Sequence, residues 1–332
     1  MSLTAGSQVV LCDVPVRLDN YVGCSHGCKY CFAQFKTNIQ KIKGSDVSKS
    51  LVDFINGKRS KETAAFDYDI TIHWGGMSDP FQPIEKNIGS SYKLLKIFAE
   101  TGYPVIISTK GKLISDEKYL DVLKNCNAVV QVSLLSEKYD KFEGVKFIDR
   151  FNMLNKVAKN VKRLIIRAQP YIPKLRDDIL KLAKSYKDAG VYGIAIEGLK
   201  TKSKGQGMVK HFGDFVIPFG KIKSDFLMIK KEYNGYDMKV YGAENRLRSL
   251  GDSLTCCGVE GLAGFKVNKF NLNHLIFDKQ NAEPEKIMNS KGVGTMCFKS
   301  LSQDSISEIA LKTYSFKELM LIYFNGNKNV IG

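Results

Sequence analysis

The stretch GCSHGCKYCF, at positions 23–32, places Cys24, Cys28 and Cys31 on one short segment, with three residues in the first gap and two in the second. Three thiolates on one loop can hold three corners of a [4Fe–4S] cube and leave the fourth iron open to a small-molecule ligand. We therefore predict that these three cysteines are metal ligands. The segment stands between an apolar run and a repeated strand and helix pattern, so it opens an α/β fold.

Four neighbouring residues support this interpretation. Gly23 and Gly27 suit a loop that folds back tightly around inorganic sulfide. The aromatic residues Tyr30 and Phe32 are predicted to shield the centre from water and to contact a bound cofactor. A zinc site is the alternative, but zinc usually requires four closed ligands in paired spacing, and His26 would have to be the fourth.

The composition is that of a globular protein. The chain has 332 residues, of which 44% are hydrophobic and 25% charged, and 50 Lys+Arg against 34 Asp+Glu give a formal charge of +16. A disordered or fibrous chain is excluded. No segment approaches the about 20 apolar residues that span a bilayer, and the first residues do not resemble a secretory signal. We predict a cytoplasmic protein with no membrane partner, and the charge favours a polyanionic partner, although dispersed lysines are also typical of a solvated surface.

Apolar, β-branched runs alternate with helical patterns through the first two thirds of the chain. The predicted strands are Gln8–Cys12, Tyr68–Trp74, Pro104–Thr109, Ala128–Leu134, Arg163–Gln169 and Gly190–Glu197. The predicted helices between them include Ile88–Glu100, Glu117–Asn125, Phe151–Asn160 and Arg176–Ala189. This alternation predicts an α/β protein with a parallel sheet, either open or curled toward a barrel, with its site at the carboxyl ends of the strands.

The pattern weakens after about residue 200. Thr201–Gly207 is polar and rich in Gly and Lys, which predicts a mobile loop, whereas Phe219–Tyr233 is predicted to be helical and Lys239–Ala243 to be one further strand. We predict two domains, a barrel over residues 1–250 and a C-terminal cap, substrate-facing, over residues 251–332.

The spacing Cys24-x-x-x-Cys28-x-x-Cys31, with an aromatic residue before the last cysteine, resembles the signature of the radical S-adenosylmethionine enzymes. The resemblance implies a partial (β/α)6 parallel barrel of the radical S-adenosylmethionine type with a C-terminal cap. It also implies a [4Fe–4S] cluster whose fourth iron is chelated by S-adenosylmethionine. One electron, from an external donor such as flavodoxin or ferredoxin, then cleaves the cofactor to a 5′-deoxyadenosyl radical that abstracts hydrogen from a substrate.

Further motifs at predicted strand ends agree with the resemblance. Gly75 and Gly76 stand where the superfamily often has Gly-Gly-Glu, with Met77 at the glutamate position, so backbone carbonyls or Ser78 are the expected acceptors for the cofactor's amino group. The alternative for the two glycines is a simple tight turn.

The run from Ser78 to Lys86 is similar to a stretch of the spore photoproduct lyase-like branch, and so is the strand end at Lys110. The resemblance implies that Lys110 meets the cofactor's carboxylate, and that Ser133 and Arg167 contact its ribose or carboxylate. Lys110 and Arg167 could instead be solvated charges.

The predicted cap holds a second group of cysteines, Cys256, Cys257 and Cys297. One of them could donate a hydrogen atom to a substrate radical, a role that a cysteine has in spore photoproduct lyase. This sequence departs from that enzyme at the donor position, so the role is our own hypothesis and not one that the resemblance implies. They could instead ligate a second cluster, bind substrate, or act as a reversible redox group. The remaining alternative is that they are small buried hydrophobic residues, which is also how we interpret Cys12 and Cys126.

The leading hypothesis is an enzyme, lyase-like or transferase-like, that acts on a nucleic acid, DNA or RNA, or on a nucleotide. Two alternatives remain open. One is modification of a peptide or small metabolite with the help of an auxiliary cluster. The other is a non-catalytic, metal-dependent nucleic-acid-binding module whose site at Cys24–Cys31 is structural.

Overall fold

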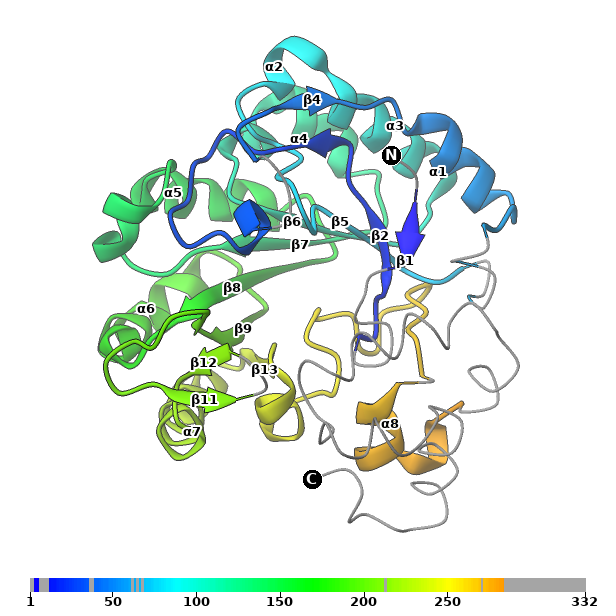
Figure 1. The fold of residues 1–332 in the computed structure, drawn as a ribbon. Helices are drawn as coiled ribbons and strands as arrows, with labels where there is room; N and C mark the ends of the chain where they lie inside the picture. Colours follow the sequence, from blue (N-terminus) through cyan, green and yellow to red (C-terminus); the bar gives the residue numbers. More distant parts are fainter. Residues whose placement is uncertain are drawn as a thin grey trace.

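A curved sheet of eight strands forms the centre of the molecule (Figure 1). The computed structural model describes residues 3–5, 12–35, 39–60, 63, 66, 69–211, 214–269 and 271–283. In sheet order the strands are β1 (Thr4–Ala5), β2 (Val16–Leu18), β5 (Ile72–Trp74), β6 (Val105–Thr109), β7 (Ala128–Ser133), β8 (Arg163–Tyr171), β9 (Gly193–Gly198) and β13 (Lys239–Gly242). Strand β1 pairs antiparallel to β2, and the other neighbours all pair in parallel. The predicted α/β class and parallel sheet are confirmed.

Helices connect the parallel strands along the outer side of the sheet (Figure 1). The α-helices are α1 (Ser48–Ile55), α2 (Glu85–Ile88), α3 (Ser90–Thr101), α4 (Glu117–Leu123), α5 (Phe147–Ala158), α6 (Arg176–Asp188), α7 (Phe219–Gly235) and α8 (Leu272–Phe277). The 3₁₀-helices are η1 (Phe32–Phe35), η2 (Lys112–Ser115), η3 (Glu137–Phe142), η4 (Pro173–Leu175), η5 (Asn245–Leu250) and η6 (Lys279–Asn281). None of the helices in the described part is long and apolar enough to cross a bilayer.

Two small sheets complete the described structure. The first pairs β3 (Tyr21–Val22) with β4 (Lys43–Gly44), and the second joins β10 (Lys200–Thr201), β12 (Asp214–Val216) and β11 (Val209–His211). The predicted mobile loop Thr201–Gly207 is thus largely the connection between β10 and β11.

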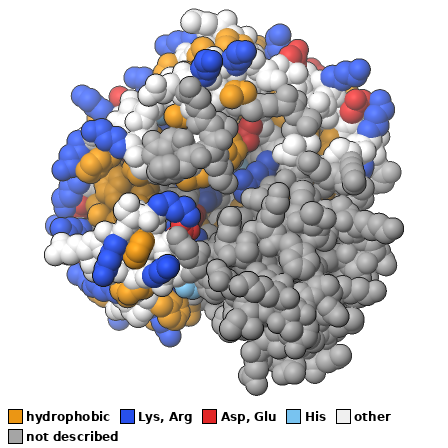
Figure 2. Space-filling model, in the orientation of Figure 1, with side chains coloured by type: hydrophobic (Ala, Val, Ile, Leu, Met, Phe, Trp, Pro, Cys, Tyr) orange, Lys and Arg blue, Asp and Glu red, His pale blue; other side chains and the backbone are white. Residues whose placement is uncertain are grey.

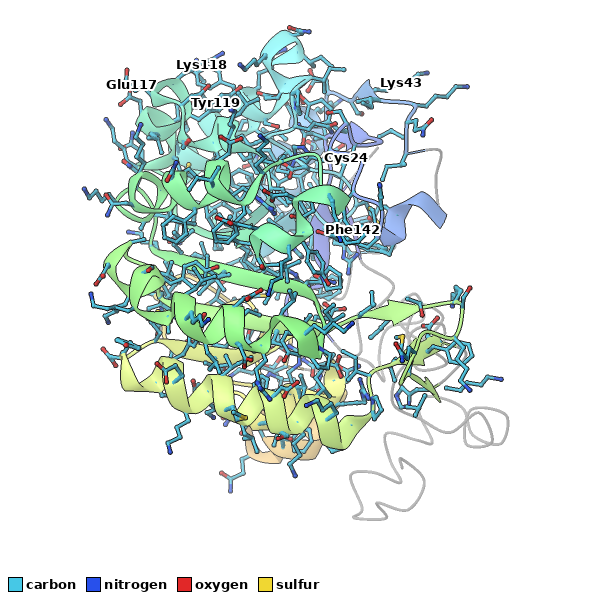
Figure 3. The ribbon with its side chains drawn as sticks, turned by 90° about the vertical axis from the view of Figure 1, so that its left-hand side faces the viewer. Cys24, Lys43, Glu117, Lys118, Tyr119 and Phe142 are labelled. Atoms are coloured by element: carbon cyan, nitrogen blue, oxygen red, sulfur yellow. The ribbon has the colours of Figure 1, made fainter. Side chains whose placement is uncertain are left out.

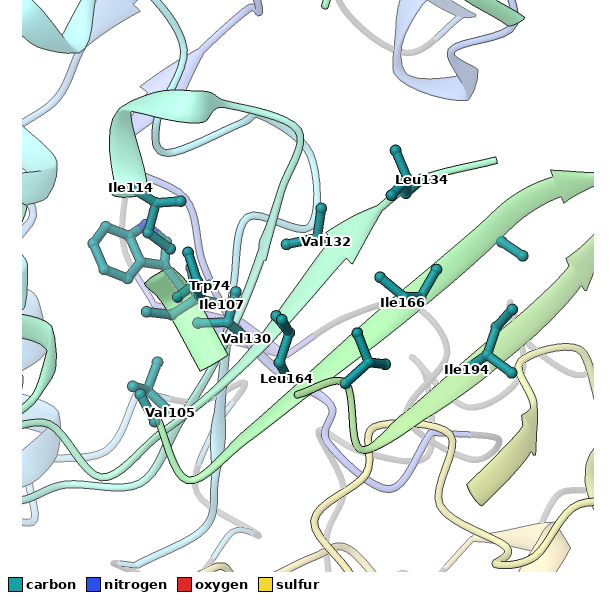
Figure 4. Close-up of a cluster of buried hydrophobic side chains, with 14 of the residues drawn as sticks. Trp74, Val105, Ile107, Ile114, Val130, Val132, Leu134, Leu164, Ile166 and Ile194 are labelled. Carbon is teal, nitrogen blue, oxygen red and sulfur yellow. The ribbon is translucent and has the colours of Figure 1, made fainter. Parts of the chain in front are cut away.

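The outer face of the sheet carries the main hydrophobic core (Figure 4). Residues Ile107, Val130, Val132 and Ile166 point toward the helices and are fully buried. Because parallel strands are covered on both faces, their sequences are almost continuously apolar, which is why the pattern predicted most of them.

The inner face of the sheet is covered by the segment of the chain that follows β13. Ile106, Val129 and Ile165, from three neighbouring strands, pack against Cys257 and Val259. A Cβ on Gly258 would lie 2.5 Å from Ile165 Cδ1, so this segment lies directly on the sheet. We call residues 255–259 the inner plug.

The start of the sheet differs from the prediction. Most of the predicted strand Gln8–Cys12 lies outside the described residues, Cys12 itself is not in a strand, and the first parallel strand is β2. This strand has only three residues, and Arg17 stands at its centre. A short strand with a charged residue lacks the apolar run on which the prediction depended.

Candidate metal centre and cofactor site

The cysteine segment lies at the carboxyl edge of the parallel sheet, as predicted. Cys24, Cys28 and Cys31 are free thiols and each is partly exposed. Their segment contacts the loops that follow β5, β6 and β7, which reach this edge together because the strands are parallel.

Gln82 holds the first part of the cysteine segment from both sides. Its side-chain oxygen accepts a hydrogen bond from the backbone N–H of Ser25 at 2.8 Å, and its side-chain nitrogen donates to the carbonyl of Gly23 at 3.2 Å. Gln82 is fully buried, so these bonds are protected from water. The result is a fixed backbone on either side of Cys24.

Asp79 anchors the same segment through His26. Its carboxylate lies 3.1 Å from His26 Nε2 and accepts from Thr109 Oγ1 at 2.7 Å and from the backbone N–H of Phe81 at 2.8 Å. Burial raises the pKa of Asp79, but His26, the backbone N–H of Lys110 and the Thr109 hydroxyl together hold it below its usual value. The carboxylate therefore ties the cysteine segment to the ends of β5 and β6.

The loop after β7 supports the third side of the cysteine segment. The backbone N–H of Lys29 donates to the carbonyl of Phe142 at 2.9 Å. A Cβ on Gly144 would lie only 1.9 Å from the carbonyl oxygen of His26, so the two backbones are in direct contact. Figure 3 labels Cys24 and Phe142 on the same side of the molecule.

The surroundings of Cys24 and Cys28 favour the protonated thiol. Burial raises the pKa of Cys24 to about 12, and burial also raises the pKa of Cys28, although Lys110 opposes that shift. Bound metal is what converts such thiols to thiolates. Among the described residues no three His, Cys, Asp or Glu side chains converge closely enough to hold one metal ion. A [4Fe–4S] cluster accepts cysteines that lie further apart, since each binds a different iron.

Lys110 points to the cysteine segment, as its predicted role requires. Its ammonium donates to the hydroxyl of Tyr30 and to Glu143 Oε1, both at 2.9 Å. Glu143 also accepts from Tyr30 and from the fully buried Arg150. Burial lowers the pKa of Lys110 to about 8. One carboxylate thus positions a cation and a phenol beside the predicted cluster.

The turn of Gly75, Gly76 and Met77 follows β5 and is held by Asp19. Asp19 Oδ1 accepts from the backbone N–H groups of Met77 at 2.9 Å and Ser78 at 3.1 Å. Gly75 has a φ of 93°, and a Cβ there would lie 2.4 Å from the carbonyl of Ser108. The glycine is therefore needed for close approach of this turn to β6.

The remaining residues predicted to contact the cofactor include Ser133, Phe32 and Arg167. The carbonyl of Ser133 accepts from Arg150 at 2.6 Å, which links it to the Lys110 network. Phe32 begins η1 and is 48% exposed. Arg167 lies on the inner face, where it pairs with Glu197.

Cys256 and Cys257 lie in the inner plug and are both buried. Their sulfur atoms are 3.8 Å apart, and the carbonyl of Cys256 accepts from Gln131 Nε2 at 3.3 Å. The Cys257 thiol, and then the guanidinium groups of Arg248 and Arg167, lower the pKa of Cys256 against the effect of burial. Cys297 lies outside the described residues, so the structure does not relate it to this pair.

Sequence reasoning missed the residues that position the site. Asp79 and Gln82 were inside a quoted motif, and their place in an apolar stretch after a strand was a usable signal. The same signal could have found Glu85, which belongs to the same motif. Its carboxylate is fully buried and accepts from the backbone N–H of Ser91 and the hydroxyl of Tyr119. Glu143 carried no local signal, because its partners are distant in the sequence.

Comparisons of the sequence with known proteins match only part of the chain. No family model matches the chain. An uncharacterised protein of Methanocaldococcus jannaschii is 27% identical over 131 residues, which cover 38% of this chain and less than half, 45%, of that protein.

Solved structures match over a larger share of the chain. Spore photoproduct lyase complexed with dinucleoside spore photoproduct has a TM-score of 0.52 at 16% identity, covering 69% of this chain and 77% of that chain. SuiB of Streptococcus suis bound to S-adenosylmethionine has a TM-score of 0.50 at 12% identity, covering 72% of this chain and 52% of that chain. The chain therefore has the partial-barrel fold of the radical S-adenosylmethionine enzymes, in the form similar to spore photoproduct lyase.

Proposed function

We propose that this chain is a radical S-adenosylmethionine enzyme in which Cys24, Cys28 and Cys31 hold a [4Fe–4S] cluster. The observation that carries the proposal is the position of three free, part-exposed thiols on one braced loop at the carboxyl edge of a parallel sheet. When bound, the cluster and S-adenosylmethionine supply a one-electron cleavage that gives a 5′-deoxyadenosyl radical able to take hydrogen from a substrate.

The residues around the loop supply binding and orientation. Lys110 offers a part-buried cation to the cofactor's carboxylate, and a fixed ammonium is a strong partner for that anion. Glu143 keeps the ammonium and the Tyr30 hydroxyl in place until the cofactor arrives. The carbonyls of the turn from Gly75 to Met77, which Asp19 fixes, are acceptors for the cofactor's amino group.

We propose a nucleotide or nucleic acid as the substrate. Two observations support this class: the formal charge of +16, and the basic side chains around most of the described surface in Figure 2. The solved structure of spore photoproduct lyase with a dinucleoside photoproduct supports the same class by analogy.

A hydrogen-donor role for Cys256 or Cys257 is a further part of the proposal. The thiol would transfer one hydrogen atom to a substrate carbon radical, and the thiyl radical left behind would be restored by one electron from the external donor and one proton from water. The contact of the Cys256 carbonyl with Gln131 places the pair on the inner side of the same sheet, which supports this role.

The test is anaerobic reconstitution with iron and sulfide, followed by dithionite and S-adenosylmethionine, with 5′-deoxyadenosine and methionine measured by mass spectrometry. We expect about four irons per chain and formation of both products. About eight irons would instead support an auxiliary cluster. Tight zinc, no iron chromophore and no cofactor cleavage would refute the proposal and favour a structural metal site.

The substrate class is tested separately by the salt dependence of binding to a DNA or RNA oligonucleotide. If phosphates are neutralised on binding, the logarithm of the affinity falls linearly with the logarithm of the salt concentration. Binding that does not change with salt would contradict a nucleic-acid substrate.

A further inference from the structure

The inner face of the sheet carries at least one polar side chain on each of six consecutive strands, from β2 to β9. Each follows a residue that faces the outer core, so strand alternation turns it inward. The strand register pairs Arg17 with His73 and Ser108 with Gln131. At the other three borders the polar residue lies two positions further along the next strand. The six are Arg17, His73, Ser108, Gln131, Arg167 and Glu197. We call them the inner-face belt.

Most of the belt is joined by hydrogen bonds. His73 Nε2 lies 2.8 Å from Ser108 Oγ, and Ser108 Oγ donates to Gln131 Oε1 at 3.0 Å. Arg167 donates to the same Gln131 oxygen at 3.2 Å and to Glu197 Oε2 at 3.1 Å. The chain of contacts is therefore continuous from β5 to β9.

Arg17 is the member that this network leaves out. It makes no hydrogen bond or ion pair with any residue in the described part of the chain, and its Nε is shut off from solvent. A part-buried cation without an ion-pair partner is costly, because no direct contact with a carboxylate compensates the hydration that its sealed Nε has lost. Unpaired charges of this kind persist where a ligand supplies the partner.

The other belt charges do not neutralise Arg17. Burial, with Arg17 and Arg167 nearby, lowers the pKa of His73 to about 3, so the imidazole is neutral at physiological pH. Glu197 is paired with Arg167. Asp19 is near enough to attract Arg17, but it makes no ion pair with it, and its Oδ1 accepts from the backbone of the turn after β5. The belt therefore carries a net positive charge at Arg17.

Arg17 also lies next to the turn that we assign to the cofactor. A Cβ on Gly76 would lie 3.3 Å from Arg17 Cδ and 3.7 Å from its Nη1. An anion held by this guanidinium would thus be bound beside the cofactor site. Figure 2 shows the described surface hollowed near its centre, with basic side chains inside the hollow.

We propose that Arg17 binds a phosphate group of the substrate on the inner face, beside the turn at Gly76. The planar guanidinium can give a phosphate two parallel hydrogen bonds, which fixes orientation as well as charge. This inference rests on the proposed function, since it names the group by which a nucleotide substrate is anchored.

The test uses a matched pair of ligands that differ only in the phosphate, thymidine 5′-monophosphate and thymidine. A pyrimidine is chosen so that the probe does not compete for the adenosyl site. Titration calorimetry on the cluster-loaded protein, without reductant, measures both affinities. We expect the wild type to bind the monophosphate about tenfold or more tightly than the nucleoside, and Arg17→Gln to lose this preference.

Two further variants serve as controls for Arg17→Gln. Arg17→Lys keeps the charge and is expected to retain part of the preference, whereas Arg176→Gln, on the outer helix α6, is expected to retain all of it. Equal affinity for the two ligands in the wild type, or an unchanged preference in Arg17→Gln, would overturn the proposal.

The carboxylate of S-adenosylmethionine is the other anion that Arg17 could bind. The same calorimetry with S-adenosylmethionine and its decarboxylated analogue separates the two. We expect Arg17→Gln to bind S-adenosylmethionine within about threefold of the wild type. A tenfold loss that is absent with the decarboxylated analogue would assign Arg17 to the cofactor and overturn a substrate role.

Thermal unfolding distinguishes a binding role from a structural one. Without phosphate, Arg17→Gln should unfold at the same or a higher temperature than the wild type, because it removes an unpaired charge. Arg167→Gln should unfold at a lower temperature, because it breaks the belt. An equal loss in both variants would show that Arg17 is structural. None of these measurements needs turnover. Absence of 5′-deoxyadenosine formation would therefore refute the proposed function, whereas the binding measurements alone decide the proposal for Arg17.

Discussion

The cysteine segment and the inner plug both contain closely spaced cysteines, but the protein surrounds them differently. Cys24, Cys28 and Cys31 are partly exposed, on a backbone held by Gln82, Asp79 and the loop at Gly144. Cys256 and Cys257 are buried on the inner face, where they pack with Ile106, Val129 and Ile165 and lie beside Gln131. The first arrangement leaves the thiols open to a ligand and the second packs them, so spacing of cysteines alone does not assign their role.

The largest effect expected from this comparison is in the cysteine segment. Cys28→Ala removes one of the three proposed ligands, so we expect loss of iron loading and of 5′-deoxyadenosine formation to background. Iron analysis and mass spectrometry measure both. Cys126→Ala is the matched control, because Cys126 is buried in the outer core, and it should leave both nearly intact. Retained cofactor cleavage in Cys28→Ala would refute the ligand assignment.

The support of the segment can be tested at Gly144. In Gly144→Ala the new methyl group meets a backbone carbonyl that cannot rotate away, so we expect a loss of about 3 kcal/mol in unfolding free energy and lower iron content. Denaturant unfolding of the metal-free protein measures the first. Gly220→Ala in α7 is the control, since its Cβ meets no atom within 4 Å. Equal stability of the two variants would mean that the loop after β7 does not brace the segment.

The packing of the inner plug can be tested at Gly258. Gly258 and Gly261 both have positive φ, 72° and 68°, but only a Cβ on Gly258 meets the sheet. Gly261→Ala should cost about 1–2 kcal/mol for the backbone alone, and Gly258→Ala about 1 kcal/mol more for the contact with Ile165. Chemical denaturation gives both values. If the two costs are the same, the plug is not tightly packed on the sheet.

The smallest effect concerns Asp19, which fixes the turn at Gly76. Burial, against the donors at Met77 and Ser78, raises the pKa of Asp19 to about 6, above the ordinary value of an unfolded chain. The wild type should therefore lose stability relative to Asp19→Asn as the pH rises from about 4 through 6, by about 1–2 kcal/mol. Unfolding free energies across this range measure the difference, and parallel pH profiles would contradict it.

The sequence was sufficient to predict the strands and helices that have a regular local pattern of apolar residues. Strand β7 was predicted within one residue, because a buried parallel strand is apolar throughout. Strand β2 was not, because it is short and Arg17 interrupts it. The cysteine spacing was visible in one segment, whereas the partnership of Lys110 with Glu143 joins residues 33 positions apart and has no local pattern.

The contact between the inner plug and the sheet has a consequence for how the protein is made. Residues 255–259 cover a face built from strands that the ribosome completes far earlier. Until they arrive, the inner sides of β6, β7 and β8 stay exposed to solvent and to chaperones, and such distant pairing slows folding. Insertion of iron should accordingly follow translation of the plug, so a chain truncated before residue 255 should load metal poorly even though all three proposed ligands are present.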